Sequence, residues 1–234
     1  MERNDMLKYK TALIIGAGPG ISASLTRSLT AAGINVAMAA RNVEKLSALA
    51  KETGARAFPV VDAADPFSVE QLFGEVDEAV GAPDIVVYNA SARAHGPLAD
   101  LKPADVHRAL DITAFGGFLA VHHAARRMVP KGHGAILLTG ASASIKGFPQ
   151  SAAFAMGKFA LRGLAQSAAR ELGPNGIHVA HFIIDGGVRK SGVIDEKDGL
   201  LTPDAIAQTY IDVLKQPRDA WSHEIDLRPW AEKF

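Results

Sequence analysis

Short apolar runs of strand length alternate with longer helical segments through almost all of the 234-residue chain. An apolar run of four to eight residues between turn signals indicates a buried strand. Alternation with helical segments favours parallel strands, because parallel neighbours need a long crossover connection. The sequence therefore predicts an α/β fold, a doubly wound parallel sheet with helices on both faces and about seven strands, at residues 11–15, 35–39, 57–61, 85–88, 135–139, 178–183 and 224–227.

Composition narrows the class of protein. Hydrophobic residues make up 48% of the chain, and no linker, low-complexity tract or repeat divides it, so we expect one domain over residues 1–234. The absence of cysteine excludes a disulfide framework, and the polar start does not resemble a secretory signal, which favours a cytoplasmic protein. The 25 basic and 25 acidic side chains balance, and no apolar run reaches membrane-spanning length. Neither nucleic acid nor membrane is an expected partner.

A glycine-rich turn joins the first expected strand to the first expected helix. Glycines at such a turn let the backbone approach a phosphate closely, and a helix N-terminus offers free N–H groups with a partial positive charge. The turn predicts a Rossmann-like dinucleotide site. The alternative is a tight turn that binds no ligand. The residues expected against the cofactor are Gly16, Gly18, Pro19, Gly20 and Ile21.

Arg41 follows the second expected strand, about twenty residues after the turn, where an acidic residue commonly accepts the ribose hydroxyls of NAD. No acid is present in the stretch Ala39-Ala40-Arg41-Asn42. A guanidinium suits the 2′-phosphate of NADP, and a charge-assisted contact of roughly 1.5 to 3 kcal/mol favours NADP by one to two orders of magnitude. NADP (NADPH) is therefore the expected cofactor rather than NAD, and an exposed arginine without a ligand is the alternative.

Further landmarks lie in register with the turn. Asp62 follows the third expected strand, Asn89-Ala90 follows the fourth, and Lys158 lies in a helical segment. Together they make residues 11–185 resemble the short-chain dehydrogenase/reductase family. The resemblance implies a hydride transfer between nicotinamide and a substrate carbonyl. It also implies that Asp62 contacts the adenine, that Asn89 and Ala90 line the cofactor groove, and that Lys158 binds the nicotinamide ribose.

The catalytic positions of that family are occupied differently here. Its tyrosine, serine and helix asparagine correspond to Phe154, Ala141 and Thr113. The family's tyrosine passes a proton to or from the substrate oxygen, and its lysine stabilises the phenolate. Phenylalanine has no such proton, so ordinary ketone reduction should lose general acid catalysis, worth about 10² to 10⁴ in rate. Ser142 is a candidate for the missing hydroxyl, although side-chain alternation along a strand points it away. The catalytic candidates are thus Lys158, Phe154, Ser142 and Thr113.

Two other positions concern the nicotinamide end of the site. The family's Pro-Gly after the sixth strand is replaced by Gly186-Gly187, which alters the wall around the carboxamide and assigns Gly186 to the cofactor. His95 follows the fourth strand, and its ordinary pKa near neutrality would suit an acid that overhangs the pocket. A solvated loop histidine is the favoured alternative. No histidine spacing predicts a metal site.

Two functions remain open. The favoured one is an NADP-dependent short-chain oxidoreductase with altered carbonyl chemistry, whose unknown small-molecule substrate needs little acid help or takes its proton from water or His95. The other is a non-catalytic NADP-binding sensor or scaffold. The resemblance also implies a homodimer or homotetramer, because relatives pair two long helices, expected here at about residues 106–128 and 152–172.

Overall fold

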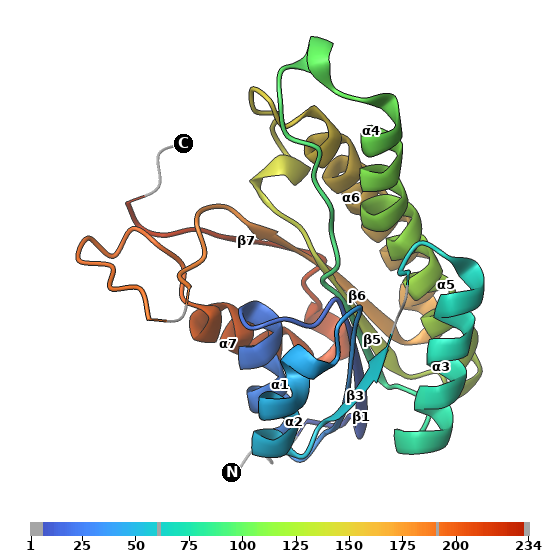
Figure 1. Cartoon of the computed structure of the whole chain (residues 1–234). Coiled ribbons are helices and arrows are strands. Elements are labelled where there is room, and N and C mark those ends of the chain that lie inside the picture. The colour runs from blue at the N-terminus through green and yellow to red at the C-terminus, as the bar shows by residue number, and fades with distance from the viewer. Residues whose placement is uncertain (1–6, 60–61, 191, 232–234) are drawn as a thin grey trace.

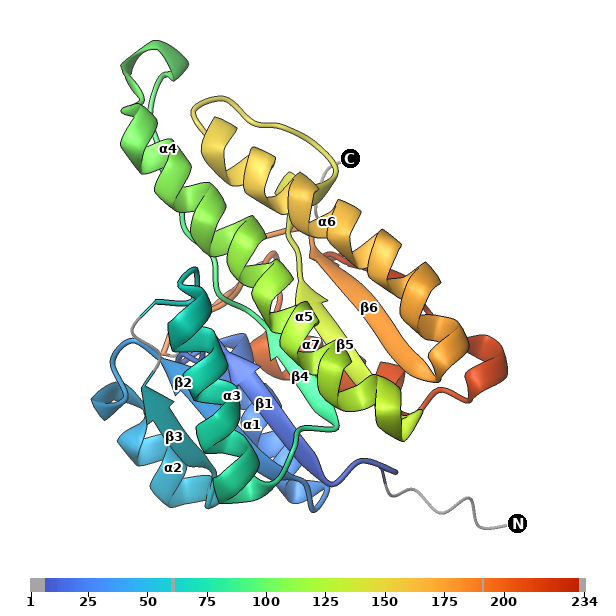
Figure 2. The same cartoon turned by 90° about the vertical axis from the view of Figure 1, so that its right-hand side faces the viewer.

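One sheet of seven parallel strands forms the centre of the molecule (Figures 1 and 2). The computed structural model describes residues 7–59, 62–190 and 192–231. The strand order is β3-β2-β1-β4-β5-β6-β7, so the predicted doubly wound sheet is confirmed. The strands are β1 (Thr11–Ile15), β2 (Asn35–Ala40), β3 (Arg56–Pro59), β4 (Ile85–Tyr88), β5 (Gly134–Thr139), β6 (Ile177–Ile184) and β7 (Glu224–Leu227).

Helices cover both faces of this sheet (Figures 1 and 2). The helices are α1 (Ile21–Ala31), α2 (Ser47–Thr53), α3 (Pro66–Val80), α4 (Pro103–Leu110), α5 (Gly116–Met128), α6 (Ala152–Leu172) and α7 (Pro203–Leu214). Within the described ranges, none of these helices is both long and apolar enough to cross a membrane. The last two residues expected in the third strand, Val60 and Val61, lie outside the described part of the chain.

Alternate residues of the central strands pack into two separate apolar clusters. In β1, Ala12 and Ile14 belong to the cluster that contains residues of α1, α2 and α7, whereas Leu13 and Ile15 belong to the cluster of α3, α5 and α6. All four side chains are fully buried. Successive strand residues point to opposite faces, and helices cover both faces, so apolar residues are favoured at nearly every position of the strand. This double burial explains the uninterrupted apolar runs in the sequence.

Several helix boundaries follow the sequence signals. Asp65 caps α3, where its carboxylate accepts a hydrogen bond from the backbone N–H of Ser68 at 2.8 Å. Thr202 caps α7 in the same way, with its hydroxyl accepting from Ala205 N at 3.1 Å. In each case a proline at the first helical position fits a site where no backbone donor is needed. The helix α6 ends at Leu172, directly before Gly173 and Pro174, and proline is common just after a helix because it cannot continue one.

The helix expected at about residues 106–128 is not one regular helix. It begins earlier, at Pro103, and a π-helical turn, Asp111–Phe115, separates α4 from α5. At this turn the hydroxyl of Tyr88, from the end of β4, donates a hydrogen bond to the carbonyl oxygen of Ile112. Gly116 leaves room for that hydroxyl, since a Cβ there would lie 2.3 Å from it. The prediction was wrong here because this strand-to-helix contact leaves no mark on the helical periodicity.

Two histidines are buried in β6, where the sequence placed them. The Nε2–H of His178 donates to the carbonyl of Ser222 at 2.9 Å, and its ring stacks on Trp221 with centroids 4.7 Å apart. His181 is 1% exposed, and its Nδ1 lies 3.5 Å from the carboxylate of Glu224. Burial lowers the pKa of both histidines, that of His181 to about 4, because desolvation disfavours the imidazolium. Both rings are therefore neutral in the folded protein at neutral pH.

We expect the free energy of unfolding to fall as the pH drops below about 6.5, the ordinary pKa of histidine. Above that pH neither state binds the proton; below it the unfolded chain takes up a proton that folded His181 does not accept. With a folded pKa of about 4, His181 should account for a loss of about 2 kcal/mol between pH 7.5 and pH 5. Urea unfolding at the two pH values measures this loss.

Matched histidine variants separate this effect from general acid sensitivity. His181→Gln should lose about 2 kcal/mol less than the parent protein over the same pH interval. His95→Gln removes an exposed histidine and should lose as much as the parent. Equal losses in all three proteins would show that His181 does not carry the pH dependence.

Candidate active site

The loops after the carboxyl ends of the strands enclose two hollows that join. The first, about 390 Å³, is lined by Arg41 and by residues that follow β1 and β4, and is called the Arg41 hollow. The second, about 430 Å³, is lined by Phe154 and by residues that follow β4, β5 and β6, and is called the Phe154 cleft. Asn89 and Ser91 line both, so the hollows form one groove. Ligands of open parallel sheets bind at this position, where the strand order changes direction between β1 and β4.

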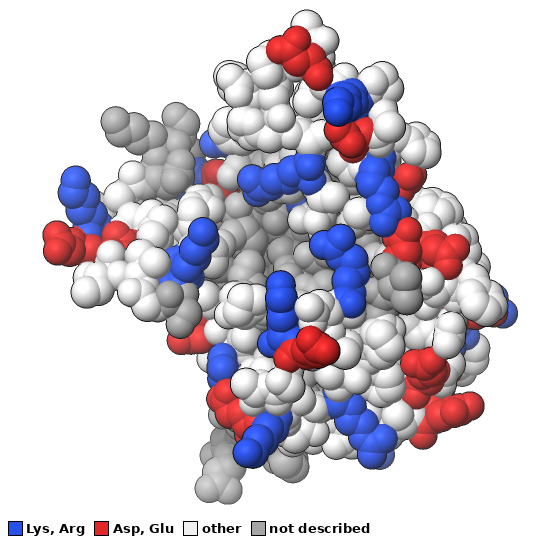
Figure 3. Space-filling view, in the orientation of Figure 1, with Lys and Arg blue, Asp and Glu red and all other residues white. Residues whose placement is uncertain are grey.

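Positive charge surrounds this region of the molecule. The face shown in Figure 3 is hollowed at its centre, and Lys and Arg side chains border the hollow. The residues that line the two hollows include Arg41, Arg108, Arg93 and Lys158, against one acid, Asp62. The charge balance of the whole chain therefore conceals a local excess of cations at the groove, which suits an anionic ligand.

The turn after β1 packs directly on the backbone that follows β4. Gly16 has φ +86°, and a Cβ on it would lie 2.4 Å from the backbone nitrogen of Ala90. At Gly18 and Gly20 the space for a Cβ is open, and no side chain caps α1. Exposed backbone and an uncapped helix start fit a phosphate group. The structure thus brings together the predicted residues of the turn, Gly16, Gly18, Pro19, Gly20 and Ile21.

Asn89 holds the same junction through its side chain. Its Nδ2 donates to the hydroxyl of Ser22 at 2.8 Å and to the carbonyl oxygen of Gly16 at 3.2 Å. Ser22 stands where the family pattern has its last glycine, and it is 2% exposed. The serine hydroxyl fills this space and satisfies the asparagine, so the departure from the glycine pattern leaves the turn intact.

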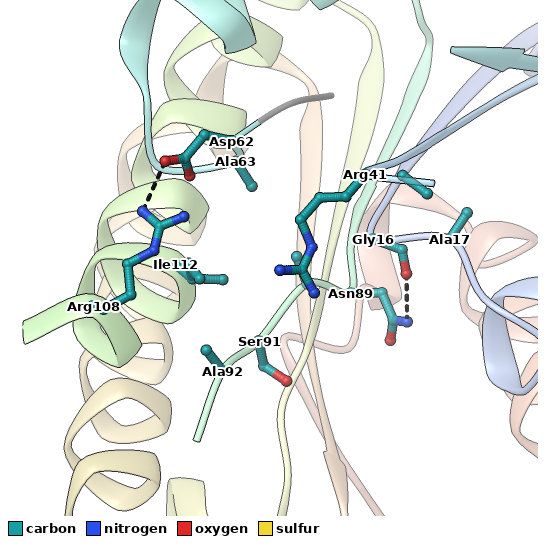
Figure 4. A pocket seen from close by; sticks show the side chains of 12 residues that line it. Gly16, Ala17, Arg41, Asp62, Ala63, Asn89, Ser91, Ala92, Arg108 and Ile112 are labelled. Carbon is teal, nitrogen blue, oxygen red and sulfur yellow. Dashed lines mark hydrogen bonds and ion pairs between the residues drawn. The ribbon is translucent and has the colours of Figure 1, made fainter. Parts of the chain in front are cut away.

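Arg41 projects into its hollow opposite an ion pair (Figure 4). Asp62 accepts a hydrogen bond from Nη1 of Arg108 at 2.7 Å, and another from the backbone N–H of Ala64 at 2.9 Å. The Arg108 contact holds the pKa of the Asp62 carboxyl below its usual range. Arg41 forms no hydrogen bond or ion pair with another described residue, so its guanidinium is available to a ligand. The sequence did not predict a role for Arg108, because this residue lies 46 positions from Asp62 and belongs to no motif.

Lys158 and Phe154 lie one helical turn apart at the base of the Phe154 cleft. Lys158 is 3% exposed, and its Nζ donates to the carbonyl oxygen of Thr139 at 2.6 Å. Burial, and then repulsion by Arg93, lowers the pKa of Lys158 to about 7. The Nζ lies 5.8 Å from the centre of the Phe154 ring. Near neutral pH this amine therefore exchanges between its protonated and neutral forms.

Thr113 and Ser142 occupy different kinds of position. Thr113 is fully buried in the π-helical turn, where its hydroxyl accepts from the backbone N–H of Ala92 at 3.0 Å, and it lines neither hollow. It holds the loop after β4 and does not reach the groove. Ser142 lines the Phe154 cleft beside Ala141. Strand alternation does not apply to Ser142, because a 3₁₀ turn, Ser142–Ser144, begins there.

Of the remaining predicted residues, one lies at the cleft and one does not. Gly186, at φ +148°, lines the Phe154 cleft as the sequence predicted. His95 lies in a different depression, with Lys102 and Asp105, and does not overhang the cleft. Arg93 borders that depression and also lines the cleft, with its Cζ 3.9 Å from the centre of the Phe154 ring. Sequence reasoning missed Arg93, because a loop position beyond the Asn-Ala motif carries no periodic or spacing signal.

Comparisons with known proteins agree with this geometry. Residues 10–194 match the short chain dehydrogenase family. A short-chain dehydrogenase/reductase of Armillaria gallica is 34% identical over 189 residues, which span 78% of this chain and 72% of the relative. A solved short-chain dehydrogenase from Rhodopseudomonas palustris has a TM-score of 0.82 at 33% identity, covering 94% of this chain and 99% of that chain. An alcohol dehydrogenase from the archaeon Thermococcus sibiricus, complexed with 5-hydroxy-NADP, has a TM-score of 0.84 at 26% identity, covering 96% and 98%.

The family match includes the glycine turn, the Arg41 hollow and the Phe154 cleft, and it ends shortly after β6. It confirms the expected class, an NAD(P)-dependent oxidoreductase. The chain belongs to the short-chain dehydrogenase/reductase family.

Proposed function

We propose that the protein is an NADP-dependent oxidoreductase of a small molecule, with its carbonyl chemistry altered at the tyrosine position of the family. The observation that carries the proposal is the continuous groove. One end presents Gly16 and Arg41, and the other presents Lys158 and a phenyl ring. The nucleotide positions are thus kept while the proton-donating phenol is absent.

The residues present fit the cofactor. Open backbone at the glycine turn and the uncapped start of α1 suit its pyrophosphate, and Asp62 and Lys158 stand at the adenine and ribose positions implied by the family. Arg41 forms no hydrogen bond or ion pair with a described residue and faces the hollow, so it would bind the 2′-phosphate of NADP (Figure 4). The complex of the Thermococcus sibiricus relative with 5-hydroxy-NADP supports the same choice.

Calorimetric titration with NADPH and NADH should show tighter binding of NADPH. Arg41→Met should weaken NADPH binding about 10- to 100-fold and leave NADH binding unchanged, because only NADPH carries the 2′-phosphate. Arg126→Met removes an exposed arginine of α5 outside the groove and should change neither affinity. Equal affinities of the parent protein for the two nucleotides would contradict the NADP preference, and the absence of any binding would contradict the proposed function.

The chain's own groups can supply the proton in a different way. The cofactor, when bound, supplies or accepts the hydride. Lys158 is the described lining residue of the cleft whose pKa lies near neutrality, and its ammonium would release a proton more readily than an ordinary lysine. Ser142, which also lines the cleft, would orient the substrate oxygen. Phe154 is 8% exposed and excludes water from the space where the family has its phenol.

Restoring the family's hydroxyls tests the role assigned to Phe154. The double variant Phe154→Tyr with Ala141→Ser should raise turnover of simple ketones by NADPH about 10²-fold or more, since general acid catalysis returns. Phe148→Tyr places a phenol elsewhere on the lining of the same cleft and should give no gain. Steady-state rates on a panel of small ketones measure both variants. No gain in the double variant would mean that the site differs from the family beyond these two positions.

Phe154 and Ala141 replace the tyrosine and the serine of the family. Their presence also favours a second candidate, a nucleotide-binding sensor or scaffold without turnover. It predicts tight NADPH binding with no oxidation of NADPH by any member of a broad carbonyl panel. An active parent protein would exclude it. The two candidates share the groove and differ only in whether hydride leaves the cofactor.

We also propose that copies of the chain associate as a homodimer or homotetramer through α5 and α6. Both helices expose large apolar side chains, with Phe118 46% and Phe159 45% exposed. Light scattering at micromolar concentration should give the mass of two or four chains. Phe118→Asp should lower that mass, whereas Phe67→Asp, at an exposed phenylalanine of α3, should not. A monomeric parent protein would contradict the proposal.

A further inference from the structure

Arg93 is held in an unusual position at the mouth of the Phe154 cleft. Its Cζ lies 3.9 Å from the centre of the Phe154 ring, which places the guanidinium over the ring face. It forms no hydrogen bond or ion pair with any other residue in the described part of the chain. Arg93 is exposed while Phe154 is buried, so the ring supports the cation from below and leaves its other side open.

A guanidinium on a ring face keeps all of its hydrogen-bond donors free. The five N–H groups lie in the guanidinium plane and point outward from its edge, while the ring contacts its face. A planar carboxylate accepts two such bonds in parallel, which neither a carbonyl nor a hydroxyl can do. The stack on Phe154 therefore orients Arg93 for an acid and also reduces the freedom that the side chain would lose on binding.

The described lining of the Phe154 cleft contains two cations and no acid, and the acids near Arg93, Asp100 and Asp105, line the neighbouring depression that Arg93 also borders. Lys158 lies on the same phenyl ring, with its Nζ 5.8 Å from the ring centre, and repulsion by Arg93 contributes to its lowered pKa. None of the described residues that line the cleft is aspartate or glutamate. The nearby Asp185 points its charge elsewhere, to Lys146 at 3.7 Å and to Arg228 at 3.3 Å. Two uncompensated cations on one ring are a cost to the folded protein that an anionic ligand removes.

We infer that the substrate of this protein carries a carboxylate, and that Arg93, supported by the Phe154 ring, binds it in the Phe154 cleft. The inference rests on the proposed function in placing substrate chemistry at this end of the groove. It adds the class of substrate, a small organic acid of a size that fits about 430 Å³. Phe154 then has a role of its own, as the platform of the anion site.

Arg93 lies in a different part of the groove from Arg41, the residue proposed for the cofactor's 2′-phosphate. Gly16 and Arg41 line the first hollow, whereas Arg93 lines the second with Phe148 and Ser151. A residue that binds substrate should affect acid binding without changing NADPH affinity. This difference separates a substrate site from an extension of the nucleotide site.

Benzoate and its neutral analogue benzamide are suitable probes, because they share a ring and differ in the carboxylate. Each is titrated by calorimetry into the full-length protein, with and without saturating NADP⁺. Benzoate should bind about 10- to 100-fold more tightly than benzamide. Arg93→Gln should abolish this difference and leave the Kd of NADPH unchanged. Arg126→Gln, the same change on the exposed end of α5, should keep the parent's preference.

The outcomes distinguish this inference from the proposed function. NADPH binding together with equal binding of benzoate and benzamide would overturn the carboxylate site and leave the nucleotide site standing. A benzoate preference that survives in Arg93→Gln would also overturn it. Inorganic phosphate that displaces benzoate at equal concentration would exclude a site specific for carboxylates. An Arg93-dependent benzoate preference without any NADPH binding would support the anion site and reject the proposed function. Circular dichroism confirms that each variant is folded.

Discussion

The groove depends on one close approach, between the turn after β1 and the backbone after β4. A side chain at Gly16 would lie 2.4 Å from Ala90 N, so the two segments meet only because residue 16 is glycine. The side chain of Asn89 stabilises the contact by donating hydrogen bonds to the Ser22 hydroxyl and the Gly16 carbonyl. Because β1 and β4 are the strands at which the sheet order reverses, this contact joins the half of the groove near Arg41 to the half near Phe154. Both hollows would lose their common wall without it.

The sequence was sufficient for the sheet and for the glycine turn. Strands buried on both faces are mostly apolar, and the turn residues beside them are chosen for backbone geometry, so both leave local signals. The π-helical turn, the Asp62–Arg108 pair and the Arg93–Phe154 stack left none. The Asp62–Arg108 and Arg93–Phe154 contacts join segments that are distant in the chain. The π-helical turn is contacted by Tyr88, which lies 24 positions before Ile112.

Local pattern also failed at Ser142 and at His95, for two different reasons. Ser142 reaches the cleft because the strand has ended and a 3₁₀ turn has begun, a change of one residue that periodicity does not resolve. His95 follows the correct motif, but its loop continues past the cleft toward α4. A motif fixes the residues that touch the backbone turn, whereas the direction of the chain beyond it depends on tertiary packing.

The exchange of a phenol for a phenyl ring has an electrostatic consequence for Lys158. In the family mechanism a phenolate and the lysine ammonium balance each other, and the pair is stabilised by their attraction. With Phe154 the lysine keeps its buried place and its bond to Thr139, but none of the described residues that line the cleft supplies an anion in place of the phenolate. The protonated form of Lys158 therefore has no negative partner among those residues, and solvent or a ligand can supply one. Nucleotide binding relies on the loops after β1, β2 and β4, whereas proton chemistry relies on α6 and the end of β5. Because different elements carry these two functions, the residues for proton chemistry can change while the nucleotide-binding residues are kept. The result is a cation-rich cleft beside a nucleotide groove.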